Sequence, residues 1–400
     1  MSRHRWICCQ IGAREHYAMP RALHAGGGLD ALLTDAWQPP GALGRLPVAA
    51  GKRFAERFHP DLVSARVIAF NTQLVRFELG QRIRGASLWE QILARNAWFE
   101  KRATAWLQKN VTDDGARFLL AYSYAARDLF RDAKARGWRT VLCQIDPGPV
   151  EEEIVKREHA RQPHLASAWQ PAPESYWQRW REECELADHI LVNSRWSGDA
   201  LEQAGIDASK IHHVPLACEI AALETAAPRK YPAQFSATRP LRALFLGQIC
   251  LRKGVAYLLE AARLLQDDPV EFHMVGASEI KPPEVPRNVR WHGPVPRSGA
   301  ARFYNEADVF LFPTLSDGFG LTQLEAQARQ LPLIASRFCG EVVQHGVNGL
   351  RLDEVSASTI ADALRACVHR PGMLAEFSRN AVSAQAFGLQ MLRQNLTRLS

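Results

Sequence analysis

The chain repeats one local pattern along most of its length: a short apolar or β-branched run, a turn, and then a longer segment with helical spacing. Because successive parallel strands need a crossover, usually a helix, this alternation predicts α/β units around parallel sheets. Strands are expected over Trp6–Ile11, Phe118–Ala121, Thr140–Ile145 and His189–Asn193, and again over Arg242–Gly247, Val270–Val275, Val289–His292, Val309–Thr314 and Leu333–Ser336. The pattern therefore predicts two doubly wound, Rossmann-like domains.

The two series of strands are separated by a stretch without strand or helix periodicity. Residues 221–240 read AALETAAPRKYPAQFSATRP, and their prolines and lack of periodicity indicate a connector. A chain of 400 residues also exceeds what one hydrophobic core usually supports. We predict an N-terminal domain over 1–218, a linker over 219–240 and a C-terminal domain over 241–380.

Composition excludes several classes of protein. No apolar run approaches the roughly 18 to 20 residues that cross a bilayer, and Arg14 and Glu15 interrupt the first apolar run too early for a secretory signal. The eight cysteines show neither a CxxC pair nor zinc-ligand spacing, which favours reduced thiols. We expect a cytoplasmic protein.

The charge is uneven along the chain. Of the net charge of +7, the segment Arg76–Arg139 carries +6, from 13 Lys and Arg against 7 Asp and Glu. A solvated basic surface and peripheral contact with the inner face of a membrane both account for this excess, because basic charge alone specifies no partner. Within the segment, apolar residues at 88, 92, 99, 103 and 107 predict an amphipathic helix that packs on the N-terminal sheet.

The stretch Ser316–Ser336, SDGFGLTQLEAQARQLPLIAS, carries the strongest functional signal. Its Gly318-Phe319-Gly320-Leu321 turn follows a predicted strand and opens a helix, where free backbone N–H groups favour a diphosphate. Glu325 lies one turn into that helix and is suited to ribose hydroxyls. Asp317, in the preceding loop, is suited to a sugar or to positive charge at its anomeric carbon.

A second phosphate-binding pattern follows the first strand of the second series. Phe245–Gly254 contains a turn glycine, Gly247, then two adjacent cations, Arg252 and Lys253, and Gly254 before the next helix. An arginine fork and a lysine ammonium stabilise a leaving diphosphate without requiring a metal. We therefore expect donor binding by these residues and a catalytic role for Lys253 and Asp317.

Together these motifs resemble the retaining glycosyltransferases of family 4, which have the two-domain GT-B fold. The resemblance runs over Glu182–Pro215, Leu244–Leu265 and Val289–Leu352. The family's Glu-x7-Glu pair corresponds to Asp317 and Glu325, so one methylene is lost at the first position. An arginine that is frequent after the first glycine is Gln248 here, and Arg252 is placed to supply the missing cation.

The resemblance implies a nucleotide-sugar donor in a cleft between the domains, a glycan, lipid-linked or small-molecule acceptor, retention of anomeric configuration, and neither a cofactor nor an obligatory metal. It also implies that Gly12 approaches the donor and that a helix within 381–400 returns to the N-terminal domain. His16, predicted on the first helix, and Asp146, which stands where many members have a histidine loop, are candidates for the acceptor side.

Other functions remain as alternatives. A nicotinamide or flavin enzyme is disfavoured, because no strand is followed by GxGxxG with an acidic residue about 20 positions later. A sugar-nucleotide epimerase or a phosphorylase shares the architecture, and fold alone does not fix chemistry. A non-catalytic protein that binds nucleic acid or a membrane through the basic N-terminal half is the alternative from another class, although no nucleic acid is expected as a partner of the enzyme.

Overall fold

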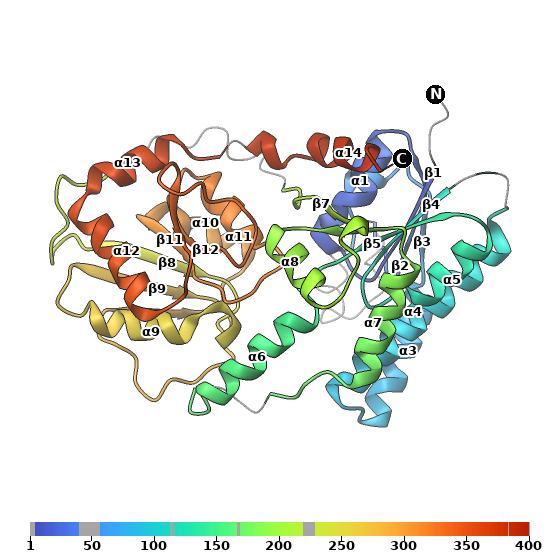
Figure 1. Ribbon diagram of the computed structural model, residues 1–400, viewed down its shortest axis with the longest axis horizontal. Helices are drawn as coiled ribbons and strands as arrows, with labels where there is room; N and C mark the ends of the chain where they lie inside the picture. Colours follow the sequence, from blue (N-terminus) through green and yellow to red (C-terminus); the bar gives the residue numbers. More distant parts are fainter. Residues whose placement is uncertain are drawn as a thin grey trace.

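A computed structural model of the chain describes residues 5–39, 57–112, 115, 117–165, 169–218, 229–382 and 384–399. Two α/β domains lie side by side (Figure 1). The N-terminal sheet is parallel, with the order β3-β2-β1-β4-β5-β6-β7. Its strands are β1 Arg5–Gln10, β2 Leu29–Thr34, β3 Val67–Ala69, β4 Arg117–Tyr122, β5 Arg139–Cys143, β6 His189–Val192 and β7 Ile211–His213.

Helices cover both faces of this sheet, and each face has its own apolar core. They are α1 Ala18–Ala25, α3 Asn71–Arg84, α4 Leu88–Asn110, α5 Arg127–Ala135, α6 Pro149–Arg161, α7 Glu174–Leu186 and α8 Arg195–Gln203. The α4 helix begins with a capping box, in which Ser87 and Glu90 bond each other's backbone N–H groups. It buries Phe99, Ala103 and Leu107 as predicted, but Leu88, predicted on the same packing face, is 72% exposed at the start of the helix.

The C-terminal sheet repeats the same design, with the order β10-β9-β8-β11-β12-β13 and parallel pairing. Its strands are β8 Leu241–Leu246, β9 Val270–Val275, β10 Val289–Gly293, β11 Val309–Phe312, β12 Leu333–Ser336 and β13 Gly349–Leu352. Its helices are α9 Val255–Leu264, α10 Arg297–Glu306, α11 Leu321–Gln327, α12 Ala357–His369 and α13 Pro371–Arg379. Two doubly wound sheets confirm the predicted fold class.

The first helix begins later than the sequence suggested. His16 and Tyr17 were expected on it, but they lie in a 3-10 turn, Arg14–Tyr17, and α1 starts at Ala18. The reason is Pro20, whose ring would clash with the carbonyl of His16 if the helix extended back that far. Glu15, His16 and Tyr17 consequently have φ angles of 50°, 52° and 61°, in the left-handed region.

The chain crosses between the domains twice. The first crossing follows β7, and residues 219–228 of the expected linker lie outside the described residues. After α13 the chain returns, and α14 Leu389–Thr397 packs on α1 (Figure 1). Leu392 and Leu396 are buried in the N-terminal core. The two connections meet where the Cys218 N–H donates to the Phe387 carbonyl at 2.8 Å.

Candidate active site

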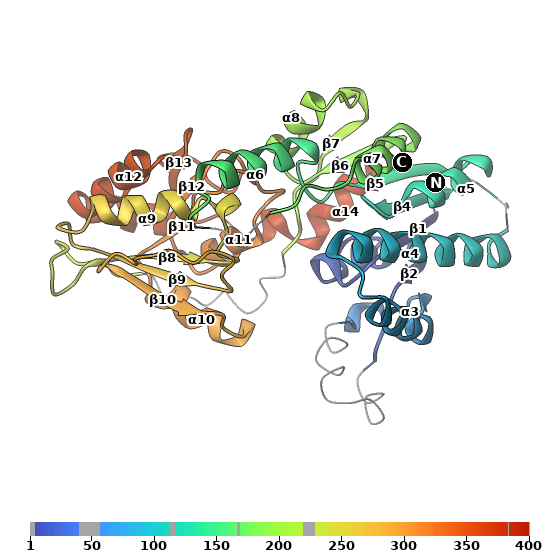
Figure 2. The ribbon, with the colours of Figure 1, turned by 90° about the horizontal axis from the view of Figure 1, so that it is seen from below.

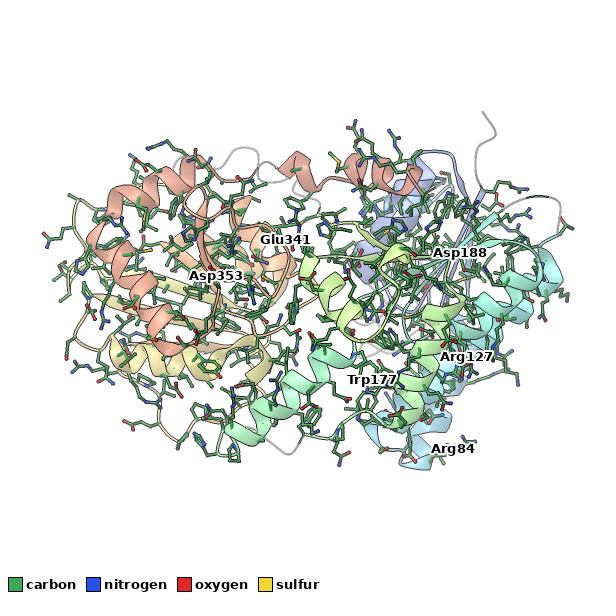
Figure 3. The ribbon with its side chains drawn as sticks, in the orientation of Figure 1. Arg84, Arg127, Trp177, Asp188, Glu341 and Asp353 are labelled. Carbon is green, nitrogen blue, oxygen red and sulfur yellow. The ribbon has the colours of Figure 1, made fainter. Side chains whose placement is uncertain are left out.

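The carboxyl ends of the two sheets face each other, and loops from both domains meet there. Ser316, after β11, donates its hydroxyl to Glu151 of α6 at 2.8 Å and accepts from the Trp196 indole of α8 at 3.0 Å. Figure 3 shows side chains of both domains meeting beside α6 and α8, and Figure 2 shows α6 extending to the C-terminal domain near α9. In doubly wound folds this edge is where ligands bind.

Two cations lie at the centre of this contact, on the 3-10 turn Leu251–Lys253 after β8. Gly254 allows the turn, because its φ is +73° and a Cβ there would stand 2.0 Å from the Pro313 carbonyl oxygen. The Lys253 ammonium pairs with Asp317 and lies 4.8 Å from the centre of the Phe312 ring. Arg252 donates to the Ser316 carbonyl at 2.7 Å and lies 3.8 Å from Asp317. Three predicted site residues are thus brought together.

Burial sets the electrostatics of this cluster. Burial, and secondly the neighbouring Arg252 charge, lower the pKa of Lys253 to about 8. Burial likewise raises the pKa of Glu151, which lies 3.5 Å from Arg252. Sequence reasoning missed Glu151, although an acidic residue two positions after Pro149 marks the first turn of a helix. The two cations therefore share two carboxylates, one from each domain.

The turn that precedes α11 is shaped by close backbone contacts. A Cβ on Gly318 would stand 2.3 Å from the carbonyl oxygen of Ile145 in the other domain. Gly320, at φ +86°, starts α11 without a side-chain cap. Phe319 is buried, its carbonyl accepts the Gly340 N–H at 2.9 Å, and its N–H donates to the Asp317 carboxylate at 3.2 Å, which ties Asp317 to this turn. Because α11 has seven residues, the cations contribute more positive potential here than its dipole.

Glu325 lies in a separate small cavity between the domains, of about 150 Å³. Its carboxylate accepts the Tyr304 hydroxyl at 2.9 Å, which fixes its orientation on α11. Leu321 lines the same cavity, and from the N-terminal domain so do Glu15 and His16. The structure thus brings His16 and Glu325 to one cavity.

Glu15 is a second residue that sequence reasoning missed. Burial raises its pKa to about 7, and Oε2 has no hydrogen-bond partner among the described residues. It begins the run of left-handed residues described above, and strained backbone of this kind tends to be retained at functional sites. Only Pro20, through its effect on the start of α1, could have signalled this turn in the sequence.

The remaining candidates make most of their contacts within their own domains, although the Asp146 Cα lies 3.6 Å from where a Cβ on Gly318 would stand. Gly12 donates its N–H to Asp35 at 2.9 Å, and Arg57 covers it, 3.0 Å from where a Cβ would stand. Asp146 accepts the Tyr124 hydroxyl at 2.5 Å and the Gly148 N–H at 2.9 Å, so its carboxylate caps a turn within its own domain. Gly247 ends β8 against the backbone of Gly276.

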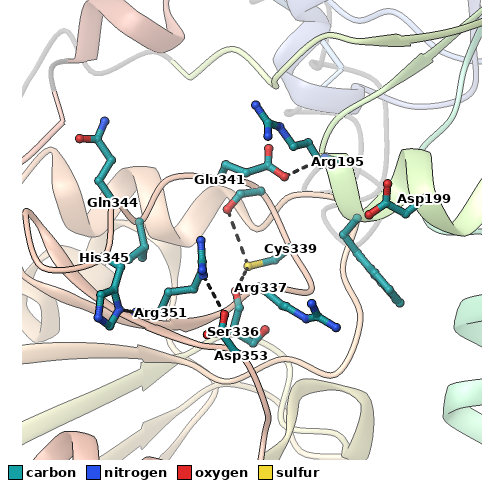
Figure 4. A pocket seen from close by; sticks show the side chains of 13 residues that line it. Arg195, Asp199, Ser336, Arg337, Cys339, Glu341, Gln344, His345, Arg351 and Asp353 are labelled. Carbon is teal, nitrogen blue, oxygen red and sulfur yellow. Dashed lines mark hydrogen bonds and ion pairs between the residues drawn. The ribbon is translucent and has the colours of Figure 1, made fainter.

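A larger pocket of about 580 Å³ lies on another side of the interdomain contact (Figure 4). Arg195 and Asp199 line it from α8, and residues between 336 and 353 line it from the C-terminal domain. The Arg195 backbone N–H donates to Glu341 at 2.8 Å across the interface. No sequence-predicted site residue lines this pocket. Among the described residues, no group of three or more His, Cys, Asp or Glu is placed to hold a metal ion.

The architecture is that of GT-B glycosyltransferases. HepE of Anabaena, solved in complex with UDP, aligns over 99% of both chains with a TM-score of 0.62 and 15% identity. Sucrose-phosphate synthase of Thermosynechococcus elongatus aligns over 99% of this chain and 98% of its own, with a TM-score of 0.65 and 16% identity. At this identity the likeness establishes the fold.

Sequence similarity is concentrated in the C-terminal domain. Residues 240–370, about a third of the chain, match the family model for glycosyl transferases group 1. A D-inositol 3-phosphate glycosyltransferase of Arthrobacter sp. (strain FB24) is 34% identical over 164 residues, which are 37% of this chain and 39% of that protein. The matches span about half or less of the length of the curated relatives.

Proposed function

We propose that the chain transfers a sugar from a nucleoside diphosphate donor to an acceptor hydroxyl, with retention of anomeric configuration and without an obligatory metal. The observation that carries the proposal is the meeting of Arg252, Lys253 and Asp317 where β8 and β11 end, at the point where the strand order of the sheet reverses. This is the position at which doubly wound sheets bind phosphorylated ligands. The match of the same region to group 1 glycosyl transferases supports it.

The cations would bind the donor diphosphate. Arg252 offers a planar fork and Lys253 a partly desolvated point charge, and both stabilise the negative charge that develops on the leaving diphosphate. In the structure these cations pair with Asp317 and Glu151. A diphosphate would take over the cations, which frees Asp317 to contact the sugar. The N–H groups of Gly318–Leu321 would complete the diphosphate contacts.

Glu325 would hold the nucleoside. A carboxylate is suited to accept hydrogen bonds from two ribose hydroxyls. The Tyr304 hydroxyl, which donates to Glu325 Oε2 at 2.9 Å, would hold the Glu325 side chain in the orientation for this contact. His16 lines the cavity beside Glu325, which supports a position of the N-terminal domain next to the donor. We propose that the acceptor binds from this side, and that closure of the two domains excludes water from the reacting groups.

The test is a donor screen. The purified chain is incubated with UDP-, GDP- and ADP-sugars, and released nucleoside diphosphate is measured for the wild type, Lys253→Ala and Asp317→Ala. Arg287→Ala is the control, because Arg287 forms an exposed ion pair with Asp267 away from the cleft. Release that is lost in both site variants and kept in the control supports the proposal. Absence of both turnover and binding with every donor would sink it.

Retention and metal independence need measurements of their own. The anomeric configuration of the product is determined by proton NMR, and an inverted linkage contradicts retention. Turnover is also measured in excess chelator, where we expect little change because Arg252 and Lys253 neutralise the diphosphate. Complete loss of turnover that a divalent metal restores would contradict the metal-independent mechanism.

The alternatives give different results in the same experiments. A sugar-nucleotide epimerase would convert the donor without transfer to an acceptor. A nucleic-acid-binding protein would show a salt-dependent affinity that survives both site variants. The comparisons favour neither.

Our proposal also includes cytoplasmic location with peripheral association at the inner face of a membrane, through the basic region of the N-terminal domain. No helix in the described part of the chain is both long and apolar enough to span a bilayer.

A further inference from the structure

The outer face of α3 carries an apolar stripe that the core does not use. Val75, Leu79 and Ile83 recur every four residues and are 40%, 54% and 87% exposed. This spacing places them on one side of the helix. The opposite side already serves the core, where Leu74 is buried and Phe77 stacks on Trp98 of α4. The stripe is therefore free to contact something outside the domain.

The turn between α3 and α4 extends this stripe. Gly85, at φ +60°, ends α3, and α4 begins at Leu88, which is 72% exposed. Ile83 and Leu88 thus stand on either side of a tight turn with their side chains in solvent. Large aliphatic side chains at such exposure cost solvation free energy, and their clustering marks an interaction surface.

Arginines border the stripe. Arg76 and Arg82 are exposed and lie on its two sides by helical position, and Arg84 follows at the end of the helix. Figure 3 places Arg84 at the outer edge of the N-terminal domain. The nearby acidic groups are Glu78, which is half-buried, and Glu90, whose carboxylate accepts the Ser87 N–H at 2.7 Å. The face is apolar in its centre and cationic at its borders.

A groove leads inward from this face. It has a volume of about 300 Å³, lies between α3 and α4, and is lined by Phe77, Leu88 and Ile92 with Arg82 and Arg95. Arg95 donates to Asp35 at 2.7 Å, and Asp35 also accepts the Gly12 N–H at the end of β1. Arg95 therefore lines the groove and is also bonded to a buried carboxylate beside the carboxyl edge of the N-terminal sheet.

We infer that the outer face of α3 and the α3–α4 turn, residues 75–88, dock on an anionic lipid bilayer and that the groove receives a lipid-linked acceptor. Val75, Leu79, Ile83 and Leu88 enter the boundary between headgroups and acyl chains, while the arginines bind lipid phosphates. The inference deepens the proposed function and rests on it for the acceptor. A second copy of the chain fits this face poorly, because its own arginines would repel those of the first.

Vesicle co-sedimentation tests the docking. The full chain is mixed with vesicles of phosphatidylcholine alone and of phosphatidylcholine with phosphatidylglycerol, and the bound fraction is measured for wild type, Leu79→Glu and Ile83→Glu. Leu264→Glu is the matched control, because Leu264 is a 53% exposed leucine on α9 of the other domain. We expect binding to the anionic vesicles that falls about tenfold or more in the α3 variants and is unchanged in the control.

The arginines are tested in the same assay. Arg76→Gln and Arg82→Gln should each weaken binding to anionic vesicles about fivefold, and added salt should reduce the difference. Circular dichroism and thermal melts check that the variants fold, which exposed positions favour. Equal vesicle binding by Ile83→Glu and wild type overturns the inference. The inference is also overturned if the wild type is a dimer in solution, the Ile83→Glu substitution dissociates this dimer, and the wild type does not bind vesicles.

A separate readout distinguishes this inference from the proposed reaction. Nucleoside diphosphate release with a soluble acceptor should be the same in Ile83→Glu and wild type, whereas transfer to an acceptor carried in anionic vesicles should fall with vesicle binding. If the wild type releases no nucleoside diphosphate with any acceptor, the proposed function is contradicted. Vesicle co-sedimentation then still tests the docking, because it does not depend on turnover. Equal transfer to vesicle-borne acceptor by both proteins would overturn the acceptor assignment.

Discussion

At the scale of single residues, the proposed chemistry depends on Lys253 and Asp317. Removing the ammonium in Lys253→Ala should lower kcat/KM about a hundredfold or more, because a buried charge that faces the leaving group acts mainly in the transition state. Asp317→Asn should keep donor binding and lower kcat. Steady-state kinetics and donor titration separate the two effects. A Lys253→Ala enzyme with unchanged kcat/KM would contradict this role.

The pKa of Lys253 gives a pH dependence with a defined sign. Burial and Arg252 lower it to about 8, so the ammonium loses its proton as the pH rises through that value. Because the cationic form is the one that binds phosphate, kcat/KM should fall above about pH 8. Lys253→Arg should keep its charge and remove this fall. A pH profile of both enzymes checks the prediction, and identical profiles would rule it out.

The sequence predicted part of the site at this scale. Asp317 and Lys253 were each predicted as site residues from the motif around them, and the structure brings them together because their strands, β8 and β11, are neighbours in the sheet. Glu151 belongs to the other domain, 166 positions before Asp317, and no local pattern predicts that they meet. The covering of Gly12 by Arg57 escaped prediction for the same reason, because it depends on a side chain 45 positions away.

At the scale of secondary-structure elements, α7 supports the start of α5. Its Glu183 is fully buried and accepts the N–H groups of Tyr124, Ala126 and Arg127 at 2.7, 2.9 and 3.3 Å. Glu183→Ala leaves these donors unpaired and should lower the free energy of unfolding by about 3 kcal/mol. The neighbouring Glu182→Ala, which breaks a surface ion pair with Arg131, should cost less than about 1 kcal/mol. Urea unfolding measures the free energy of unfolding of both variants. Equal decreases would contradict the role of Glu183 at the start of α5.

Element prediction succeeded where apolar runs are strong and failed where strands are short. The strands Val270–Val275 and Leu333–Ser336 have the predicted bounds: the second is apolar up to its last residue, and the first alternates buried apolar residues with Glu271 and His273. The short edge strands β3 and β7 have three residues each and were not predicted. β2 and β13 were missed too, since the first follows a glycine run and the second overlaps Gly346–Gly349.

At the scale of the whole molecule, Gly318 permits the close approach of the two domains. Its Cα faces the Ile145 carbonyl, where an added methyl would stand 2.3 Å away. Gly318→Ala should therefore hold the domains slightly open and lower kcat about tenfold, through loss of closure. Gly372→Ala is the control, because a methyl added there would have no atom within 4 Å. Small-angle scattering measures the opening of the domains, and kcat measures its effect on turnover. A radius of gyration and a kcat that both equal the wild-type values would refute the prediction.

The paired crossings between the domains also determine how the molecule can move. A single connection would allow one domain to rotate about several axes relative to the other. Here the first connection is bonded to the second, Cys218 to Phe387, and the Phe387 ring lies against Phe319 in the turn before α11. Two adjacent connections restrict the relative rotation of the domains more than a single one would, and we expect rotation mainly about one axis through both. Through the Phe387 ring, we therefore expect a change in the angle between the domains to reach the Gly318–Leu321 turn.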